Sequence, residues 1–539
     1  MAPTWKGSPE LIEAHPVDFD VASHFMDEDG DKITYTMTIN LAGADGTWRG
    51  LKIVDGHVVG VPTLAGHFTN VAQSTVTIDL NDGHGGTSQW FFALTIFQNK
   101  APVVTRPNID HLVGIGAPVD YEVTDQGRVF SDADGDALSY DIEFTPLPLG
   151  LTVTGTRVHG ALDSNGAVYV HVKARDGFGG TAEDVFAIAA PFAEERRPNL
   201  PAVSYVYDDT RLTLPIVVQF SREHFAPLWD TQGQHAFVTD AGATLGRVLF
   251  YDRRLSITNR GACASCHHQE HGFAAPERFT AGPQGELTKR NVMALMGVRY
   301  NLDDDYFFDR RAHGLEKAVV FPIEEPTELG NSMPLLVEKL RAVDFYPPLF
   351  EAAFGTAEIT PDRITNALSQ FLRSLIGFDT RFDKAYHLMN PNDQPQPEAV
   401  LTAEELRGAE IFNGSGHCFL CHSQGAQTMD RLTNDALDLE PLDPGAGNGN
   451  FRTTTLRNVA VTAPYMHDGR FTTLREVIEH YSSGIVQTDH TPPELSGMSA
   501  AQSPNLNLSE EDKDALEAFL DTLTDHGFLT DPRFSDPFQ

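Results

Sequence analysis

The chain has 539 residues, 41% of them hydrophobic, which is enough for several domains with buried cores. Its 39 basic and 75 acidic residues give a formal charge of −36. An acidic surface of this kind argues against nucleic acids and anionic membrane surfaces as partners, because both repel negative charge. The sequence contains no run of about 18 apolar residues, so we expect no transmembrane segment.

Residues 1–190 alternate apolar and polar side chains in short runs, for example at 33–39 and 168–172, which predicts half-buried antiparallel strands. Two patterns recur along this segment: Asp-x-Asp-Gly-Asp at 27–31 and 132–136, and a glycine-rich turn at 81–87 and 175–181. Each repeat has about one hundred residues, the length of an immunoglobulin-like sandwich. We therefore expect two all-β sandwiches, at 1–98 and 99–192. Both resemble bacterial cadherin-like (Ig-like) repeats, which implies spacing, adhesion or partner docking.

The Asp-rich clusters at 27–31 and 132–136 have two interpretations. Calcium is a hard cation that binds carboxylate and carbonyl oxygens, and these clusters supply both. Asp and Gly also form tight turns beside strands without any metal. The sequence leaves both alternatives open, so calcium in the N-terminal repeats is a hypothesis.

A linker is expected at 193–235, because residues 190–201 carry three prolines and a Glu-Glu-Arg-Arg run. From about residue 235 the apolar residues follow helical spacing, as at 335–340 and 364–372. A helix is predicted over 509–523, with Ser509 as its N-cap. We expect two mainly α cytochrome c-type domains, at 236–400 and 401–539.

Every cysteine of the chain belongs to one of two Cys-x-x-Cys-His motifs. The first comprises Cys263, Cys266 and His267, and the second comprises Cys418, Cys421 and His422. This spacing is typical of c-type haem attachment, in which the cysteines bond the haem and the histidine binds the iron. A four-cysteine zinc site would leave both histidines unexplained, and a redox dithiol is expected beside a βαβ pattern. The motifs therefore predict two covalently attached haems.

Several blocks around the motifs resemble the bacterial diheme cytochrome c peroxidase superfamily, which includes the MauG oxidases. They lie at 245–256, 290–291, 307–312, 322–328 and 455–470. The resemblance covers roughly residues 240 to 525 and leaves out the N-terminal repeats. It implies one haem that reacts with hydrogen peroxide and a second haem that stores or relays oxidising equivalents.

The resemblance implies an open coordination position on the first haem, whose iron is held by His267. In many relatives a distal histidine follows the haem histidine, and Pro283 stands at that position here, so no displaceable ligand is expected. The family moves the peroxide proton with a glutamate, and Glu328 matches its position. The alternative for Glu328 is a solvated loop carboxylate. Ala318 stands where the family has a glutamine, so one polar group of the pocket is missing.

The second haem has His422 as its proximal ligand, and the resemblance makes Tyr481 its sixth ligand. A phenolate is a hard, anionic donor that favours oxidised iron, so Tyr481 indicates storage of high-valent iron rather than routine electron uptake. A buried aromatic residue on a helix is the alternative role for Tyr481. His480 and Met466 are the other candidate ligands.

Between the haems the family usually has a tryptophan, but Phe308 stands at that position. Charge sharing would then use Tyr306, Tyr465 or direct tunnelling. The family also binds a calcium ion between its haem domains. The matching positions are Asn291, Thr462 and Pro464.

We therefore expect an enzyme that uses hydrogen peroxide to form high-valent iron and then oxidises an electron donor or a protein substrate. Covalent haem attachment predicts a periplasmic or extracellular protein, from which a signal peptide has been removed, because residues 1–6 do not form one. One alternative is a diheme electron-transfer cytochrome without catalysis, with two six-coordinate haems. Another is a surface-adhesion module in which the N-terminal repeats carry the main role.

Overall fold

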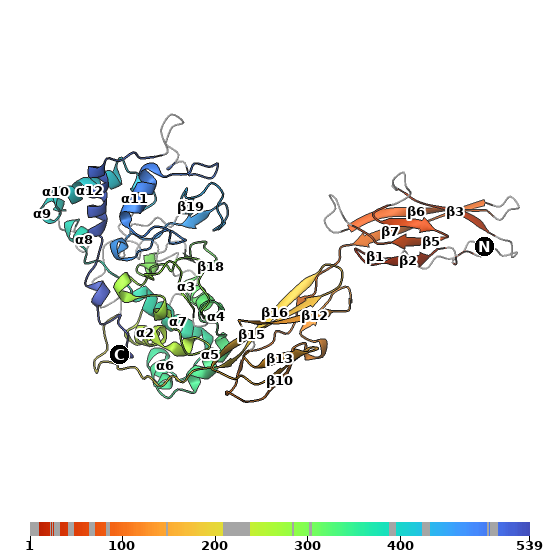
Figure 1. Cartoon of the computed structure of the whole chain (residues 1–539), viewed down its shortest axis with the longest axis horizontal. Helices are drawn as coiled ribbons and strands as arrows, with labels where there is room; N and C mark the ends of the chain where they lie inside the picture. The colour runs from red at the N-terminus through yellow and green to blue at the C-terminus, as the bar shows by residue number, and fades with distance from the viewer. Residues whose placement is uncertain are drawn as a thin grey trace. The chain divides into compact units, whose positions relative to one another are not determined.

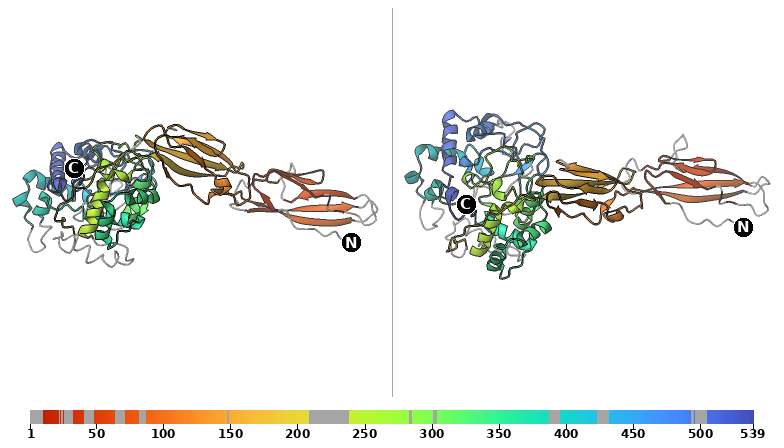
Figure 2. Two further views of the ribbon diagram at one scale, coloured as in Figure 1. Left: turned by 90° about the horizontal axis from the view of Figure 1, so that it is seen from below. Right: turned by 60° about the horizontal axis from the view of Figure 1, so that its bottom comes forward.

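The structure, a computed structural model, describes most of the chain and divides it into two compact units. The described residues are 10–21, 23, 25, 33–40, 48–63, 71–81, 87–146, 149–207, 238–282, 285–300, 304–386, 395–422, 432–492, 495 and 505–539. Unit 1 comprises residues 1–164 and 168–188, and unit 2 comprises 165–167 and 189–539. Figures 1 and 2 show strands in the red-to-yellow first part of the chain and helices in the green-to-blue remainder.

Unit 1 contains two sets of strands with the same connectivity. The first set is β1 (Glu10–Ile12), β2 (Val17–Asp20), β3 (Thr34–Ile39), β4 (Leu51–Val54), β5 (His57–Gly60), β6 (Val71–Asn81) and β7 (Thr87–Phe97). The second is β8 (Val103–Val104), β9 (His111–Leu112), β10 (Val119–Glu122), β11 (Phe130–Ser131), β12 (Ser139–Thr145), β13 (Leu151–Thr154), β14 (Arg157–Gly160), β15 (Gly166–Arg175) and β16 (Thr181–Ala190).

The sheet orders make the repetition visible. One set forms the sheets β1-β7-β6-β3 and β2-β5-β4, and the other forms β9-β16-β15-β12 and β10-β14-β13, with a short β8–β11 pair. Along β6 and β7 the buried residues alternate with exposed ones: Val76, Ile78, Phe92, Leu94 and Ile96 all face the interior. The strands predicted at 33–39 and 168–172 are confirmed as β3 and part of β15, but in β15 Tyr169 is buried along with Val168 and Val170, so this run is not half-buried.

Unit 2 is mainly helical. Its helices are α2 (Asp240–Tyr251), α3 (Leu315–Ala318), α4 (Val320–Glu324), α5 (Met333–Arg341), α6 (Tyr346–Phe354), α7 (Pro361–Ser374), α8 (Arg381–Ala385), α9 (Pro397–Val400), α10 (Ala403–Asn413), α11 (Leu474–Ser483) and α12 (Glu510–Asp521). Two hairpins accompany them: β17 (Asp305–Tyr306) with β18 (Ala312–His313), and β19 (Leu432–Asn434) with β20 (Asn450–Arg452). None of the helices in the described ranges is long and apolar enough to cross a membrane.

The same helix crossing occurs twice in unit 2, and each time it depends on a glycine. A Cβ atom added to Gly246 of α2 would lie 2.0 Å from the carbonyl oxygen of Ala367 in α7. A Cβ atom added to Gly408 of α10 would lie 1.9 Å from the carbonyl oxygen of Ala515 in α12. Only glycine permits such close approach of two backbones. In both crossings the first helix leads into a Cys-x-x-Cys-His motif.

The predicted helices of this unit are confirmed, including the last one. The Ser509 hydroxyl accepts a hydrogen bond from the backbone N–H of Asp512 at 3.2 Å, as expected for an N-cap. Leu516 and Phe519 on the inner face of α12 are buried in a cluster with Phe412 of α10. This packing orders the segment that carries the second motif.

The described part of the expected linker lies on unit 2 rather than standing free. The backbone N–H of Phe192 donates to the carbonyl oxygen of Thr258, and the Arg254 guanidinium donates to that of Glu194. The Tyr207 ring is buried, and its hydroxyl donates to the carbonyl oxygen of Arg533. Residues 192–207 therefore belong structurally to the helical unit. The rest of the expected linker, residues 208–235, lies outside the described residues.

Candidate active site

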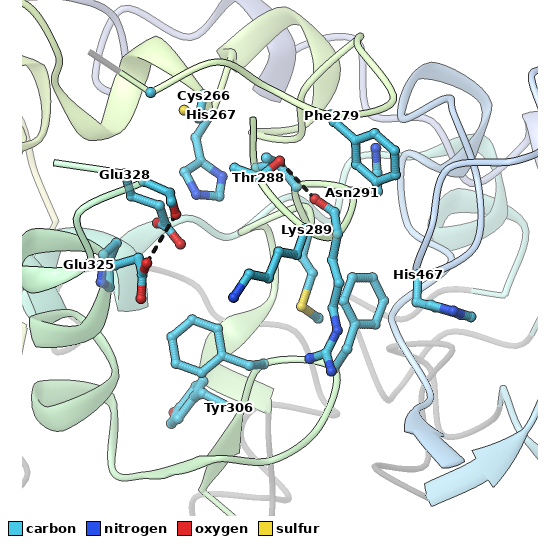
Figure 3. A pocket seen from close by; sticks show the side chains of 18 of the residues that line it. Cys266, His267, Phe279, Thr288, Lys289, Asn291, Tyr306, Glu325, Glu328 and His467 are labelled. Carbon is cyan, nitrogen blue, oxygen red and sulfur yellow. Dashed lines mark hydrogen bonds between the residues drawn. The ribbon is translucent and has the colours of Figure 1, made fainter. Parts of the chain in front are cut away.

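The first Cys-x-x-Cys-His motif lines a cavity of about 1300 Å³ in unit 2 (Figure 3). Cys263 and Cys266 form a short helical turn after α2, and the turn brings the His267 ring to the same cavity. The Nδ1 atom of His267 lies 2.7 Å from the carbonyl oxygen of Phe273. Since a carbonyl oxygen only accepts, Nδ1 carries the proton, and the lone pair is left on Nε2. Burial lowers the pKa of His267 to about 4. This neutral, oriented ring fits a haem iron.

Glu328 faces the same cavity from the loop after α4 (Figure 3). Its backbone N–H donates to the carbonyl oxygen of Glu325 at 2.9 Å, which fixes the turn. Burial raises the pKa of the Glu328 carboxyl, while the Arg311 guanidinium lowers it and the Glu325 carboxylate raises it further. A raised pKa brings a carboxyl group closer to the range in which it can both accept and return a proton.

No amide side chain stands at the position where the family has its glutamine. Ala318 lines the cavity as a buried methyl group at the end of α3. Pro283 lies outside the described residues. His268 and His271 do not line this cavity, and Nδ1 of His271 lies 3.1 Å from the carbonyl oxygen of Val461. The structure thus brings His267 and Glu328 together and holds these neighbouring histidines apart from them.

The second motif lines a separate cavity of about 280 Å³. Cys418, Cys421 and His422 share its wall with Tyr481 of α11. The Nδ1 atom of His422 lies 3.1 Å from the carbonyl oxygen of Thr454, an arrangement like that of His267. Burial, with a contribution from the carboxyl of Asp435, holds the pKa of Tyr481 well above its ordinary value. A cation at the phenol oxygen would oppose that shift, as iron does.

The alternative ligands for the second site differ in their placement. Met466 lines the second cavity. His480 is buried with Nε2 2.8 Å from the carbonyl oxygen of Asp435, and it does not line the cavity. This geometry leaves Tyr481 and Met466 as the candidates that reach the space beside His422.

The two cysteine pairs line different cavities. A single zinc site built from all four is therefore excluded. Each pair instead stands beside a histidine and an enclosed volume. Burial raises the thiol pKa of both Cys263 and Cys418 to about 12. The residues present fit covalently attached haem.

One wall separates the two cavities. Its members line both: Asn291, Val292, Met293, Ala294, Val298, Phe308, Arg452 and His467. Within this wall the His467 ring stacks on Phe451 with 3.7 Å between centroids, and Phe308 meets Phe451 edge-on at 6.4 Å. Tyr306 lines only the first cavity and Tyr465 only the second.

The residues predicted for calcium also come together. Asn291, Thr462 and Pro464 all line the second cavity. The amide nitrogen of Asn291 donates to the carbonyl oxygen of Glu277 at 3.2 Å, so the amide oxygen of Asn291 points away from Glu277. In unit 1 the carboxylates of Asp132, Asp134 and Asp136 lie within 4.8 Å of one another, while residues 27–31 lie outside the described residues.

Sequence reasoning missed a group of basic side chains around the first cavity. They are Arg260, Arg278, Lys289, Arg290, Arg311, Arg452 and Arg470. These residues come from segments far apart in the sequence, and three of them, Arg290, Arg311 and Arg470, stood in the blocks already singled out. In a chain of charge −36 such a gathering is distinctive, and it suits the anionic propionate groups of a haem.

Comparison with known proteins agrees with this site. The family model described as di-haem cytochrome c peroxidase matches residues 240–390. The methylamine utilization protein MauG of Methylorubrum extorquens is 32% identical over 296 residues, which cover 53% of this chain and 79% of that protein. The chain belongs to the diheme cytochrome c peroxidase family. Cytochrome c551 peroxidase of Nitrosomonas europaea is 29% identical over 294 residues, which cover 52% of this chain and 79% of that protein.

A solved structure of a MauG-like protein associated with microbial copper homeostasis has 32% sequence identity and a TM-score of 0.49. That alignment covers 56% of this chain and 94% of the other. As a member of the diheme peroxidase family, the chain is an oxidoreductase with two c-type haems.

Proposed function

We propose that this diheme enzyme reduces hydrogen peroxide at the first cavity and oxidises a donor with the equivalents it gains. The observation that carries the proposal is the placement of His267 and Glu328 on one cavity (Figure 3). Bound haem iron supplies the centre at which peroxide is reduced and oxidising equivalents are held. Cys263 and Cys266 would attach this haem, and Nε2 of His267 would bind its iron.

Glu328 moves the proton in this proposal. Its carboxylate accepts a proton from hydrogen peroxide and returns it to the departing oxygen, which leaves as water. The raised pKa of the Glu328 carboxyl supports this role, because the group must hold the proton for the short time before it returns it. The Arg311 guanidinium opposes the shift and favours the ionised form of Glu328. With Ala318 in place of an amide, Glu328 would carry proton transfer without that second polar group.

At the second cavity, Cys418 and Cys421 would attach a haem held between His422 and Tyr481. An anionic phenolate ligand stabilises the oxidised state, which suits storage of oxidising equivalents. Between the cavities Phe308 replaces an oxidisable tryptophan, so electrons would cross the shared wall by tunnelling. The wall supports this route because its members touch both cavities.

The remaining assignments follow the sequence. We propose two immunoglobulin/cadherin-like sandwiches at 1–98 and 99–192, a linker at 193–235, and two cytochrome c-type domains at 236–400 and 401–539. Calcium would bind near Asn291, with backbone oxygens of Thr462 and Pro464, and a second calcium would bind at 132–136. Covalent haem attachment supports a periplasmic or extracellular location.

Electron paramagnetic resonance of the ferric holoprotein tests the proposed function. An open first haem gives a high-spin signal beside the low-spin signal of the second haem. Two low-spin haems without any high-spin signal would instead identify an electron-transfer cytochrome and overturn the enzymatic proposal. Stopped-flow addition of hydrogen peroxide completes the test, because the high-spin signal must be lost when peroxide reacts.

A further inference from the structure

Tyr306 lies on the first cavity, at the end of β17, and pairs with Ala312 of β18 in the hairpin. Among the described residues it is the one tyrosine that lines this cavity, and no described tryptophan lines either cavity. Tyr306 is buried, with 7% of its surface exposed, and Figure 3 labels it with His267 and Glu328 around the same space. An aromatic side chain that is easily oxidised therefore stands where peroxide would be reduced.

The Tyr306 hydroxyl has a proton acceptor in place, because it donates a hydrogen bond to a carboxylate oxygen of Asp304 at 2.9 Å. Burial and the Asp304 carboxylate hold the pKa of Tyr306 well above its ordinary value, so the phenol keeps its proton. A phenol that loses an electron but keeps its proton becomes a cation, and an unpaired charge in a buried site is costly. Loss of an electron therefore needs a base within hydrogen-bond distance to take the proton, and Asp304 occupies that position.

The backbone holds Asp304 in this position. The backbone N–H of Gly314 donates to the carbonyl oxygen of Asp304 at 2.7 Å, which extends the β17–β18 hairpin by one pair. Asp304 has φ +55°, a left-handed conformation that aspartate adopts more readily than most residues. In this conformation its carboxylate bonds the phenol of the residue two positions later. Asp304 is partly exposed, so a proton that it accepts can exchange with water.

Two other tyrosines of the described chain show what is particular to Tyr306. The Tyr346 hydroxyl also donates to a carboxylate, that of Asp252 at 2.5 Å, but the Arg254 guanidinium already donates to both oxygens of this carboxylate. Tyr346 also lines neither cavity. Tyr465 lines the second cavity, but its hydroxyl donates to a backbone carbonyl oxygen, which is too weak a base to take a proton. Of the three, Tyr306 combines a place on a haem cavity with a carboxylate partner.

The proposed reaction needs a group that can be oxidised beside the first haem. Reduction of one hydrogen peroxide molecule to water takes two electrons from the enzyme. Phe308 and His467, the aromatic residues that line both cavities, are harder to oxidise than tyrosine. Tyr306 is the oxidisable aromatic group that the first cavity offers for one of these electrons.

We propose that Tyr306 is a redox-active residue of the first cavity, which gives one electron to the peroxide-oxidised haem and its phenol proton to Asp304. The inference rests on the proposed function and names a residue that holds one of its two oxidising equivalents. The O–H bond of Tyr306 breaks, an O–H bond forms on Asp304, the haem gains one electron, and a neutral tyrosyl radical remains. An electron from the donor and the proton from Asp304 then restore the phenol. Because Tyr306 lines only the first cavity, it holds the equivalent there and does not bridge the two haems.

Freeze-quench electron paramagnetic resonance of the full-length holoprotein tests this role of Tyr306. The ferric protein is mixed with hydrogen peroxide in the absence of any donor and frozen within milliseconds. The spectrum should lose the high-spin ferric signal and gain a radical signal that narrows when the protein carries ring-deuterated tyrosine. In Tyr306→Phe this radical signal should be absent. In Asp304→Asn the amide oxygen can accept the hydrogen bond but not the proton, so the radical yield should fall by about tenfold or more.

Tyr465→Phe is the matched control, because it removes a cavity phenol that donates only to a backbone carbonyl, and it should keep the parent radical yield. Haem absorbance confirms that each variant carries its haems, and if Tyr306→Phe does not, the Asp304→Asn result decides. If the parent reacts with peroxide but forms no tyrosyl radical, or if the radical survives in Tyr306→Phe, the inference is wrong and the proposed function stands. A parent-like radical yield in Asp304→Asn would likewise overturn the inference. If peroxide leaves the high-spin signal in place, the proposed function itself fails.

Discussion

At the scale of single residues, proton transfer at the first cavity depends on Glu328. Replacing it with glutamine removes the group that accepts and returns the proton, so the rate of reaction with hydrogen peroxide should fall by about a hundredfold or more. Stopped-flow absorbance of the ferric holoprotein measures that rate. Glu324→Gln is the control, because Glu324 is an exposed residue of α4 that does not line the cavity.

The rate of reaction with hydrogen peroxide should change with pH in a defined direction. The carboxylate is the form that accepts a proton, and burial raises the pKa of Glu328 above that of an ordinary glutamate. The rate should therefore be high above this raised pKa and fall as the pH drops through it. Glu328→Gln should abolish this acid limb. An unchanged limb in that variant would assign the proton transfer to another group.

Tyr481 governs the second cavity. In Tyr481→Phe no phenol oxygen remains to bind iron, so the low-spin ferric signal should give way to a high-spin one and the reduction potential should rise. Tyr465→Phe is the control, since the Tyr465 hydroxyl lines the same cavity but donates to the carbonyl oxygen of Val459 at 2.9 Å. A low-spin signal that survives Tyr481→Phe would point to Met466 as the ligand.

At the scale of elements, the duplicated helix crossings set the positions of both motifs. Gly408→Ala would gain about 1 kcal/mol of helix propensity in α10. The added methyl group would meet the carbonyl oxygen of Ala515 at 1.9 Å, a backbone atom that moves only if α12 moves. Overpacking of this kind costs about 1–3 kcal/mol, and here it should prevail because the contact is with backbone.

We therefore expect Gly408→Ala to lower the free energy of unfolding of the helical unit by about 2 kcal/mol. Chemical denaturation followed by haem absorbance measures the change. Glu410→Ala, an exposed substitution in the same helix, should stay within about 0.5 kcal/mol of the parent protein. Equal stability of the two variants would mean that α10 and α12 tolerate a wider separation.

Local patterns in the sequence predicted the elements well, because strands, helices and haem motifs depend on residues close in the chain. The alternation in β6 and β7 and the cap at Ser509 are examples. The walls of the cavities were not predicted, because they join distant segments. Asp438 and Asp443, in the loop between β19 and β20, line the first cavity and pair with Arg470 and Arg290, and no periodicity encodes such pairs.

The aromatic wall illustrates the same limit. The sequence identified Phe308 as a substitution and suggested Tyr306 and Tyr465 as its replacements. In the structure these tyrosines line one cavity each, whereas Phe308 and His467 line both. Which side chain stands between two cavities depends on how the elements pack, and a single sequence does not give that packing.

At the scale of the whole molecule, the chain combines a strand unit and a helical unit with separate cores. Both Cys-x-x-Cys-His motifs and both cavities lie in the helical unit. The contacts that Phe192, Glu194 and Tyr207 make with it also fall after residue 190. Among the described residues, those that line the two cavities all lie after residue 190.

Removal of residues 1–190 should therefore leave the peroxidase reaction intact. We expect haem content and the ferric spectrum to match the full chain, and kcat with hydroquinone to stay within about twofold, less than ~0.5 kcal/mol in the barrier. Loss of turnover with intact haem spectra would show that the strand unit acts in catalysis. Loss of haem would show that the helical unit needs the strand unit to fold. If turnover persists while the natural partner no longer binds, the repeats serve docking, as their cadherin-like pattern suggests.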